Sequence, residues 1–77
     1  MNNEQMQVLA AFDVAMQGFV TAWEDKSTTP QTVLIAYGAA SIMLVLVRQM
    51  TDANEAVKLA AKLLNDAAEQ IGVPPIH

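Results

Sequence analysis

The chain has 77 residues, a net charge of −4 and no cysteine. This length fits a single domain spanning 1–77, and the lack of thiols excludes disulfides and thiolate metal sites. Only four basic residues are present, so we expect no binding of nucleic acid through its phosphates.

Hydrophobic residues make up 53% of the chain and charged residues only 16%. An average domain is about a quarter charged, and a chain this small buries only about 60% of the surface that its unfolded form exposes. Two interpretations remain open. Alanine-rich helices could raise the apolar fraction without forming large apolar patches, or another chain could cover apolar surface.

The first predicted helix covers 3–25. Its large apolar side chains recur at steps of three and four residues, which places them on one side of a helix. They are Met6, Leu9, Phe12, Met16, Phe19, Val20 and Trp23. Gly18 lies inside this pattern and lowers helix stability by about 1 kcal/mol relative to alanine, which indicates a close helix contact or a bend.

The end of this helix holds a candidate partner contact, formed by Trp23, Glu24 and Asp25. Carboxylates are unfavourable at the negative end of a helix dipole. A basic group on a partner would explain Glu24 and Asp25, and so would an ordinary loop. Trp23 is either a cap on the core or an exposed anchor for a partner.

The second predicted helix covers 30–49. Thr29 precedes Pro30, and a residue before proline favours the extended geometry that a helix N-cap needs. Pro30 suits the first helical position, where its missing N–H has no partner in any case. The uncharged run from Val33 to Val47 would be about 22 Å long, which is shorter than a hydrocarbon core of about 30 Å. It predicts a buried helix and argues against a membrane span.

Three rows of side chains run along this second helix, and none is polar before its last turn. We expect the other two helices to cover about two rows, and the same helix of a second copy to cover the third. Small residues such as Gly38 either let another backbone approach or relieve crowding in the core. A ligand site and complete covering within a monomer remain alternatives for this face. The candidate self-association interface is Leu34, Ile35, Gly38, Ala39, Ile42, Val45 and Leu46.

The third predicted helix covers 52–71, and Asp52 with Glu55 has the spacing of a capping box at its start. Its apolar residues gather on one side and its charged residues on the other. The apolar side is Ala53, Ala56, Val57, Ala60, Leu63, Leu64, Ala67 and Ile71. Gly72 ends the helix, and the tail 72–77, with its two prolines, is predicted to be extended.

No residue pattern predicts catalysis. His77 is the only histidine, and a terminal residue is rarely held against a substrate. Tyr37 and Ser41 share a helix face, where we expect Ser41 to bond to its own backbone and Tyr37 to direct its hydroxyl to the surface. The protein is therefore expected not to be an enzyme, and we assign no catalytic, metal-ligating or cofactor-binding residue.

The sequence thus predicts an all-α protein, a small three-helix bundle with a central hydrophobic helix that assembles as a homodimer. We expect a small acidic protein–protein interaction module that acts as an adaptor, regulator or inhibitor of a larger, unidentified protein. The alternatives are a binder of a lipid-like small molecule and a membrane-associated small protein. The first 16 residues lack the basic region of a signal peptide, so a cytoplasmic location is expected.

Overall fold

The computed structural model describes residues 3–50 and 55–72, and these residues form three helices and no strand. The helices are α1 (Asn3–Glu24), α2 (Pro30–Met50) and α3 (Glu55–Ile71). The predicted all-α, three-helix fold is therefore confirmed, with the first two helices ending within one residue of their predicted bounds. The start predicted at Asp52 and most of the predicted tail, 73–77, lie outside the described residues.

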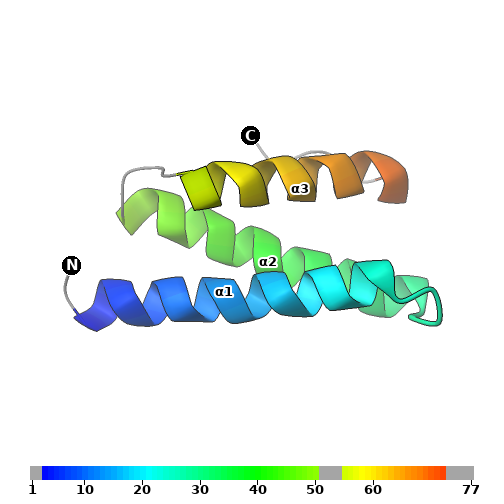
Figure 1. Ribbon diagram of the computed structural model, residues 1–77, viewed down its shortest axis with the longest axis horizontal. Coiled ribbons are helices and arrows are strands. Elements are labelled where there is room, and N and C mark those ends of the chain that lie inside the picture. The colour runs from blue at the N-terminus through cyan, green and yellow to red at the C-terminus, as the bar shows by residue number, and fades with distance from the viewer. Residues whose placement is uncertain (1–2, 51–54, 73–77) are drawn as a thin grey trace.

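The three helices lie side by side, with α1 and α3 flanking α2 (Figure 1). Helix α1 runs antiparallel to α2, and the short loop after Glu24 joins them at one end of the molecule. Most contacts between helices join α1 to α2 and α2 to α3. Helix α2 is thus the central element of the fold.

The start of α2 is the cap that its sequence predicts. The Thr32 amide donates to the Thr29 hydroxyl oxygen at 3.3 Å, and the Val33 amide donates to the Thr29 carbonyl at 3.1 Å. At the end of α2, the side-chain amide of Gln5 donates to the Met50 carbonyl at 3.0 Å. This bond ties the first turn of α1 to the last turn of α2 and satisfies a carbonyl that has no partner within its own helix.

The end of α3 confirms the stop predicted at Gly72. Gly72 has a φ of 92°, which lies in the left-handed region where a side chain would be strained. Its amide donates to the Ala68 carbonyl at 2.8 Å. This is the left-handed glycine cap that commonly terminates helices.

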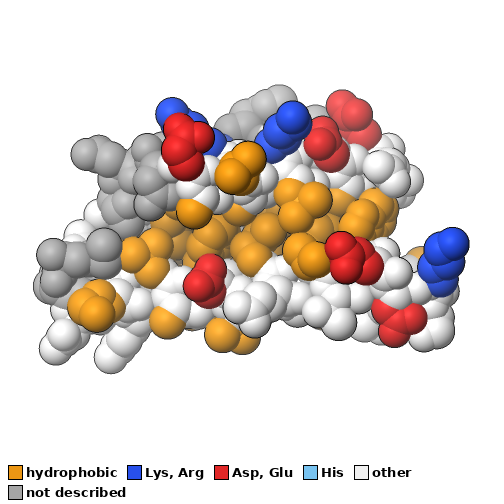
Figure 2. Space-filling model, viewed as in Figure 1, with side chains coloured by type: hydrophobic (Ala, Val, Ile, Leu, Met, Phe, Trp, Pro, Cys, Tyr) orange, Lys and Arg blue, Asp and Glu red, His pale blue; other side chains and the backbone are white. Residues whose placement is uncertain are grey.

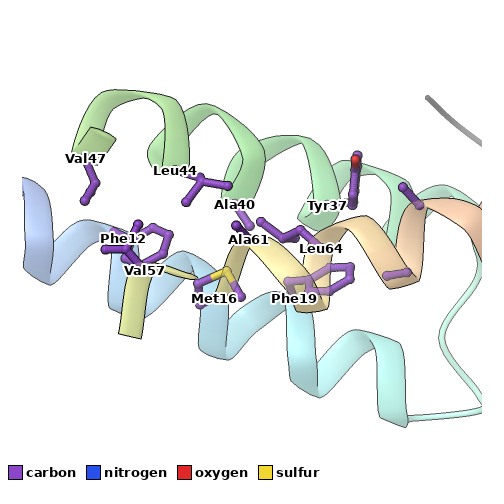
Figure 3. Close-up of a cluster of buried hydrophobic side chains, with 12 residues drawn as sticks. Phe12, Met16, Phe19, Tyr37, Ala40, Leu44, Val47, Val57, Ala61 and Leu64 are labelled. Carbon is purple, nitrogen blue, oxygen red and sulfur yellow. The ribbon is translucent and has the colours of Figure 1, made fainter. Parts of the chain in front are cut away.

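A single cluster of twelve buried apolar residues forms the core, and all three helices contribute to it (Figure 3). Phe19 is its centre of aromatic contacts. Its ring stacks on Trp23 with centroids 6.1 Å apart and meets the edge of Tyr37 at 6.0 Å. The twelve residues are Phe12, Met16, Phe19, Tyr37, Ala40, Leu44, Val47, Val57, Ala61, Leu64, Ala67 and Ala68.

Two residues that the sequence placed on the core side lie on the surface instead. Met6 is 57% exposed, and Ala56 is also exposed. A residue six positions before Phe12 lies about 120° around the helix from it, and a residue one position before Val57 lies about 100° away. The spacing of three and four residues therefore predicts the core-facing side correctly for most of each helix. At Met6 and Ala56 the side chain lies too far around the helix to reach the core.

Candidate functional site

One side of α2 faces the core of the bundle. Tyr37, Ala40, Leu44 and Val47 are buried there, and Ala40 and Leu44 are 0% exposed. They lie at steps of three and four residues, so they form one stripe along the helix. In Figure 3 these four side chains extend from α2 toward residues of α1 and α3.

The opposite side of α2 is open, and it carries all seven residues of the predicted self-association interface. We call these seven residues the α2 outer face. Ile35 is 73% exposed, Ile42 64%, Leu34 45%, Val45 43% and Leu46 40%, while Ala39 is exposed and Gly38 half-buried. An apolar face of this length on a chain of 77 residues is a feature of proteins that bind a partner.

The expectation that the other helices cover two of the three rows on α2 is wrong. Only the row through Ala40 and Val47 is well covered, and the row through Ile35 and Ile42 is exposed along its length. The reason is that α1 and α3 both pack toward the shared core cluster, so both contact the same side of α2. More apolar surface is left open than the sequence predicts.

Charge is almost absent from the open side of α2. Between Pro30 and Met50 the only charged residue is Arg48, which is exposed in the last turn. A basic residue there interacts favourably with the negative end of the helix dipole. Exposed Gln31 and Gln49 lie near the two ends of the same side. The α2 outer face is thus an apolar stripe between polar ends.

Gly38 has no role in packing within one chain. A Cβ atom built at Gly38 would meet nothing within 4 Å. Crowding in the chain's own core therefore does not explain the glycine. Gly18 in α1 is in the same situation, so no helix of the chain approaches either glycine closely.

Two of the three residues of the predicted partner contact at the end of α1 line one hollow. Trp23 and Asp25 line a hollow of about 320 Å³, together with Lys26, Val33 and Ile71 among others, whereas Glu24 is not part of its lining. Trp23 is half-buried and stacked on the core, as the capping interpretation expects.

Asp25 belongs to the loop rather than to an ion pair. Its carboxylate accepts hydrogen bonds from the Ser27 amide at 2.9 Å and from the Ser27 hydroxyl at 2.7 Å. The hydroxyl bond first, and then the amide bond, lowers the pKa of Asp25 below its ordinary value of 3.8. This is a local aspartate turn, which explains an acidic residue at the end of α1 without a partner.

The two hydroxyls of the apolar run from Val33 to Val47 behave differently. The Ser41 hydroxyl donates to the Tyr37 carbonyl at 2.7 Å, which confirms the predicted bond to its own helix. The prediction for Tyr37 is wrong, because its hydroxyl is buried and has no hydrogen-bond partner among the described residues. Tyr37 lies in the same stripe as Ala40 and Leu44, so its ring enters the core and carries the hydroxyl with it.

A second apolar region lies between α1 and α3, along the apolar sides that the sequence predicts for these two helices. Figure 2 shows it as a band along the molecule with charged side chains on either side. Partly buried residues that pack on the core, such as Val20, Ala60 and Leu63, belong to these two helices. They are more covered than the α2 outer face, so this band is the weaker candidate for a partner.

The described residues 3–50 and 55–72 contain no group of three histidine, cysteine or acidic side chains that could hold a metal ion. Comparison with known proteins finds no matching family model, no similar curated protein and no similar solved structure. The function is therefore inferred from the exposed apolar residues of α2.

Proposed function

We propose that this protein is a small helical interaction module that self-associates through the α2 outer face. It would act on a larger protein as an adaptor, regulator or inhibitor, without an enzymatic activity of its own. The observation that supports this is the set of five large apolar side chains, 40–73% exposed, on one side of a single helix. Leaving that side open to water is unfavourable, and a two-fold pairing requires only one self-complementary patch.

The expected strength of association follows from how much of this face is open. Fully burying a leucine, isoleucine or valine contributes about 1.5–3 kcal/mol, and these five side chains are open by roughly half. Two copies would therefore gain about 10 kcal/mol, which is similar in size to the cost of association, about 4–15 kcal/mol. The net gain is then at most about 6 kcal/mol, so we expect a weak, reversible dimer with a dissociation constant of roughly tens of micromolar or higher.

A matched pair of substitutions tests the proposal. Ile42→Glu places a charge in the α2 outer face, and Val14→Glu places the same charge on the exposed side of α1, where Val14 is 70% exposed. Burying an unpaired carboxylate is strongly unfavourable, so Ile42→Glu should raise the dissociation constant at least about 100-fold. Sedimentation equilibrium of the wild type and both variants, from low micromolar to millimolar concentration, measures this effect.

The Val14→Glu variant is the control and should associate like the wild type. Circular dichroism should show that both variants keep their helices, because neither position is buried. A wild-type chain that stays a folded monomer at millimolar concentration would refute the proposal. Equal weakening by both variants would mean that association does not use the α2 outer face.

The membrane alternative has one supporting observation. Helix α2 has 21 residues, and by length and composition it is the one helix of the described part that could cross a membrane. Its inner side, however, is packed in the core, and a span would have to give up those contacts. Co-sedimentation of the protein with lipid vesicles, with no dimer in buffer, would favour this alternative.

The small-molecule alternative also has one supporting observation, the hollow beside Trp23. Its volume of about 320 Å³ lies at the lower end of the range for ligand sites, and Asp25 and Lys26 offer polar groups at its rim. Native mass spectrometry of the purified protein would favour this alternative if it found a bound small molecule.

A further inference from the structure

Six positions on the outer side of α2 follow alternating steps of four and three residues. We call them the α2 seam: Gln31, Ile35, Gly38, Ile42, Val45 and Gln49. This spacing is the one that keeps a stripe of residues facing a partner helix in a coiled coil. Ile42 lies about 140–160° around the helix from each of the four buried residues of α2, so the seam faces away from the core.

We infer that a second copy of this chain binds the α2 seam in the antiparallel orientation, with the two Ala40 residues at the same level. This inference rests on the proposed self-association and specifies its geometry. In such a pair, residues equidistant from Ala40 meet across the two-fold axis. Gln31 and Gln49 are equally distant from Ala40, so polar residues pair with polar residues at both ends.

The sizes of the inner seam residues match in this orientation. Ile35 meets the partner's Val45, and both are large and exposed. Gly38 meets the partner's Ile42, whose side chain is 64% exposed and can occupy the open space above the glycine. A parallel pair would instead set Gly38 against the partner's Gly38, which leaves that level empty and loses contacts between the helices.

The charges near the ends of α2 favour the same orientation. Arg48 lies near one end of α2, and Glu24, Asp25 and Lys26 precede the other end, which therefore has a net charge of −1. A parallel pair would place the two Arg48 residues side by side. The antiparallel pair separates them by about 24 Å along the axis and brings each Arg48 to the acidic end of the partner.

Cysteine cross-linking distinguishes the two orientations, because the natural chain has no cysteine. The probes are the single variants Gln31→Cys and Gln49→Cys, each exposed in one chain. A disulfide requires Cα atoms within about 4.4–6.8 Å of each other, so only facing positions should oxidise together. Each variant is oxidised alone and in an equal mixture in which one variant carries ¹⁵N, and the products are separated and weighed by mass spectrometry.

The antiparallel pair predicts no disulfide in either variant alone and a disulfide between ¹⁵N-labelled and unlabelled chains in the mixture. The double variant should then cross-link nearly completely. Homodisulfides in each variant alone would overturn the antiparallel inference while leaving self-association in place. A dimer in sedimentation that forms neither product would also overturn it, whereas a chain that is monomeric throughout would overturn the proposed function.

Spin labels on Gln49→Cys give an independent reading that does not require a disulfide to form. The two labelled positions would lie about 27 Å apart along the axis of an antiparallel pair, since the partner's Gln49 lies at the level of Gln31. In a parallel pair they would be neighbours. A short distance between the labels would overturn the antiparallel inference even if cross-linking failed.

Discussion

The outward sides of α1 and α2 are equally open to solvent but differ in chemistry. On α1, the large apolar residues Val14 and Met6 are both exposed, and the polar residues Gln7, Asp13, Gln17 and Thr21 are exposed on the same side. On α2, five large apolar residues share one side, and the only polar side chains between the first and the last of them in the sequence are Ser41 and the buried Tyr37. Single apolar residues on a surface need no explanation, but a continuous row does. The difference therefore supports the proposal that association uses the α2 outer face and not the outward side of α1.

The largest expected effect is a loss of stability on substitution of the inner side of α2, compared with a small change on substitution of its outer side. Leu44→Ala removes a fully buried side chain and should lower the free energy of unfolding by about 3 kcal/mol. Leu46→Ala, two residues along the helix and 40% exposed, should change the stability of the monomer by only about 0.5 kcal/mol. Urea unfolding at a concentration too low for dimers measures both. A loss for Leu46→Ala as large as that for Leu44→Ala would show that the outer face belongs to the fold.

The two helical glycines offer a direct test of the difference between α1 and α2. Gly38→Leu fills the space that the partner's Ile42 would occupy and should weaken the dimer about tenfold, as overpacking typically does. A Cβ atom at Gly18 also meets nothing within 4 Å, and Gly18 lies outside the α2 outer face, so Gly18→Leu should leave association unchanged. Sedimentation of the two variants beside the wild type provides the comparison. Unchanged association in both would place the interface away from Gly38.

A smaller effect concerns the one buried polar atom that lacks a partner in the described residues. Tyr37→Phe removes the unsatisfied hydroxyl and should raise the free energy of unfolding by about 1 kcal/mol. The ring contact with Phe19 would be kept. Thermal unfolding at low concentration is the measurement. A destabilised variant would mean that the hydroxyl binds a group in solution, such as a water molecule.

The smallest effect is expected at the loop between α1 and α2. Ser27→Ala removes the hydroxyl that lowers the pKa of Asp25, so that pKa should rise toward 3.8. Because the pKa is lower in the folded chain, Asp25 stabilises the fold at pH values above its unfolded pKa, and this contribution is lost as the pH falls through the folded pKa. An NMR titration of the Asp25 carboxyl group reports the change, and an unaltered titration would contradict the role of Ser27.

The bounds of the helices could be predicted well because the sequence has residues that favour helix starts and stops at their ends. Thr29 with Pro30 and the glycine at position 72 each allow one local geometry, and the structure shows both caps. The identity of the open side of α2 could also be predicted, since the seven residues share one side of a helix. How many rows the other helices cover could not, because that depends on where α1 and α3 sit around α2.

The prediction for Tyr37 failed for a similar reason. A tyrosine within an apolar helix can turn either way, and only the positions of neighbouring helices decide whether its hydroxyl reaches water. Here the stripe through Ala40 and Leu44 points into the core, and Tyr37 belongs to that stripe. The stacked position of Trp23 was one of two interpretations that the sequence left open, and packing against Phe19 decides between them.

Gly38 affects the stability of the single chain and the proposed association in opposite directions. The single chain would be more stable with alanine there, by about 1 kcal/mol, because glycine loses more backbone entropy in a helix and the added methyl group would meet open space. If the proposed pairing through α2 is correct, an alanine at position 38 would stabilise the single chain and at the same time take up part of the space for the partner's Ile42.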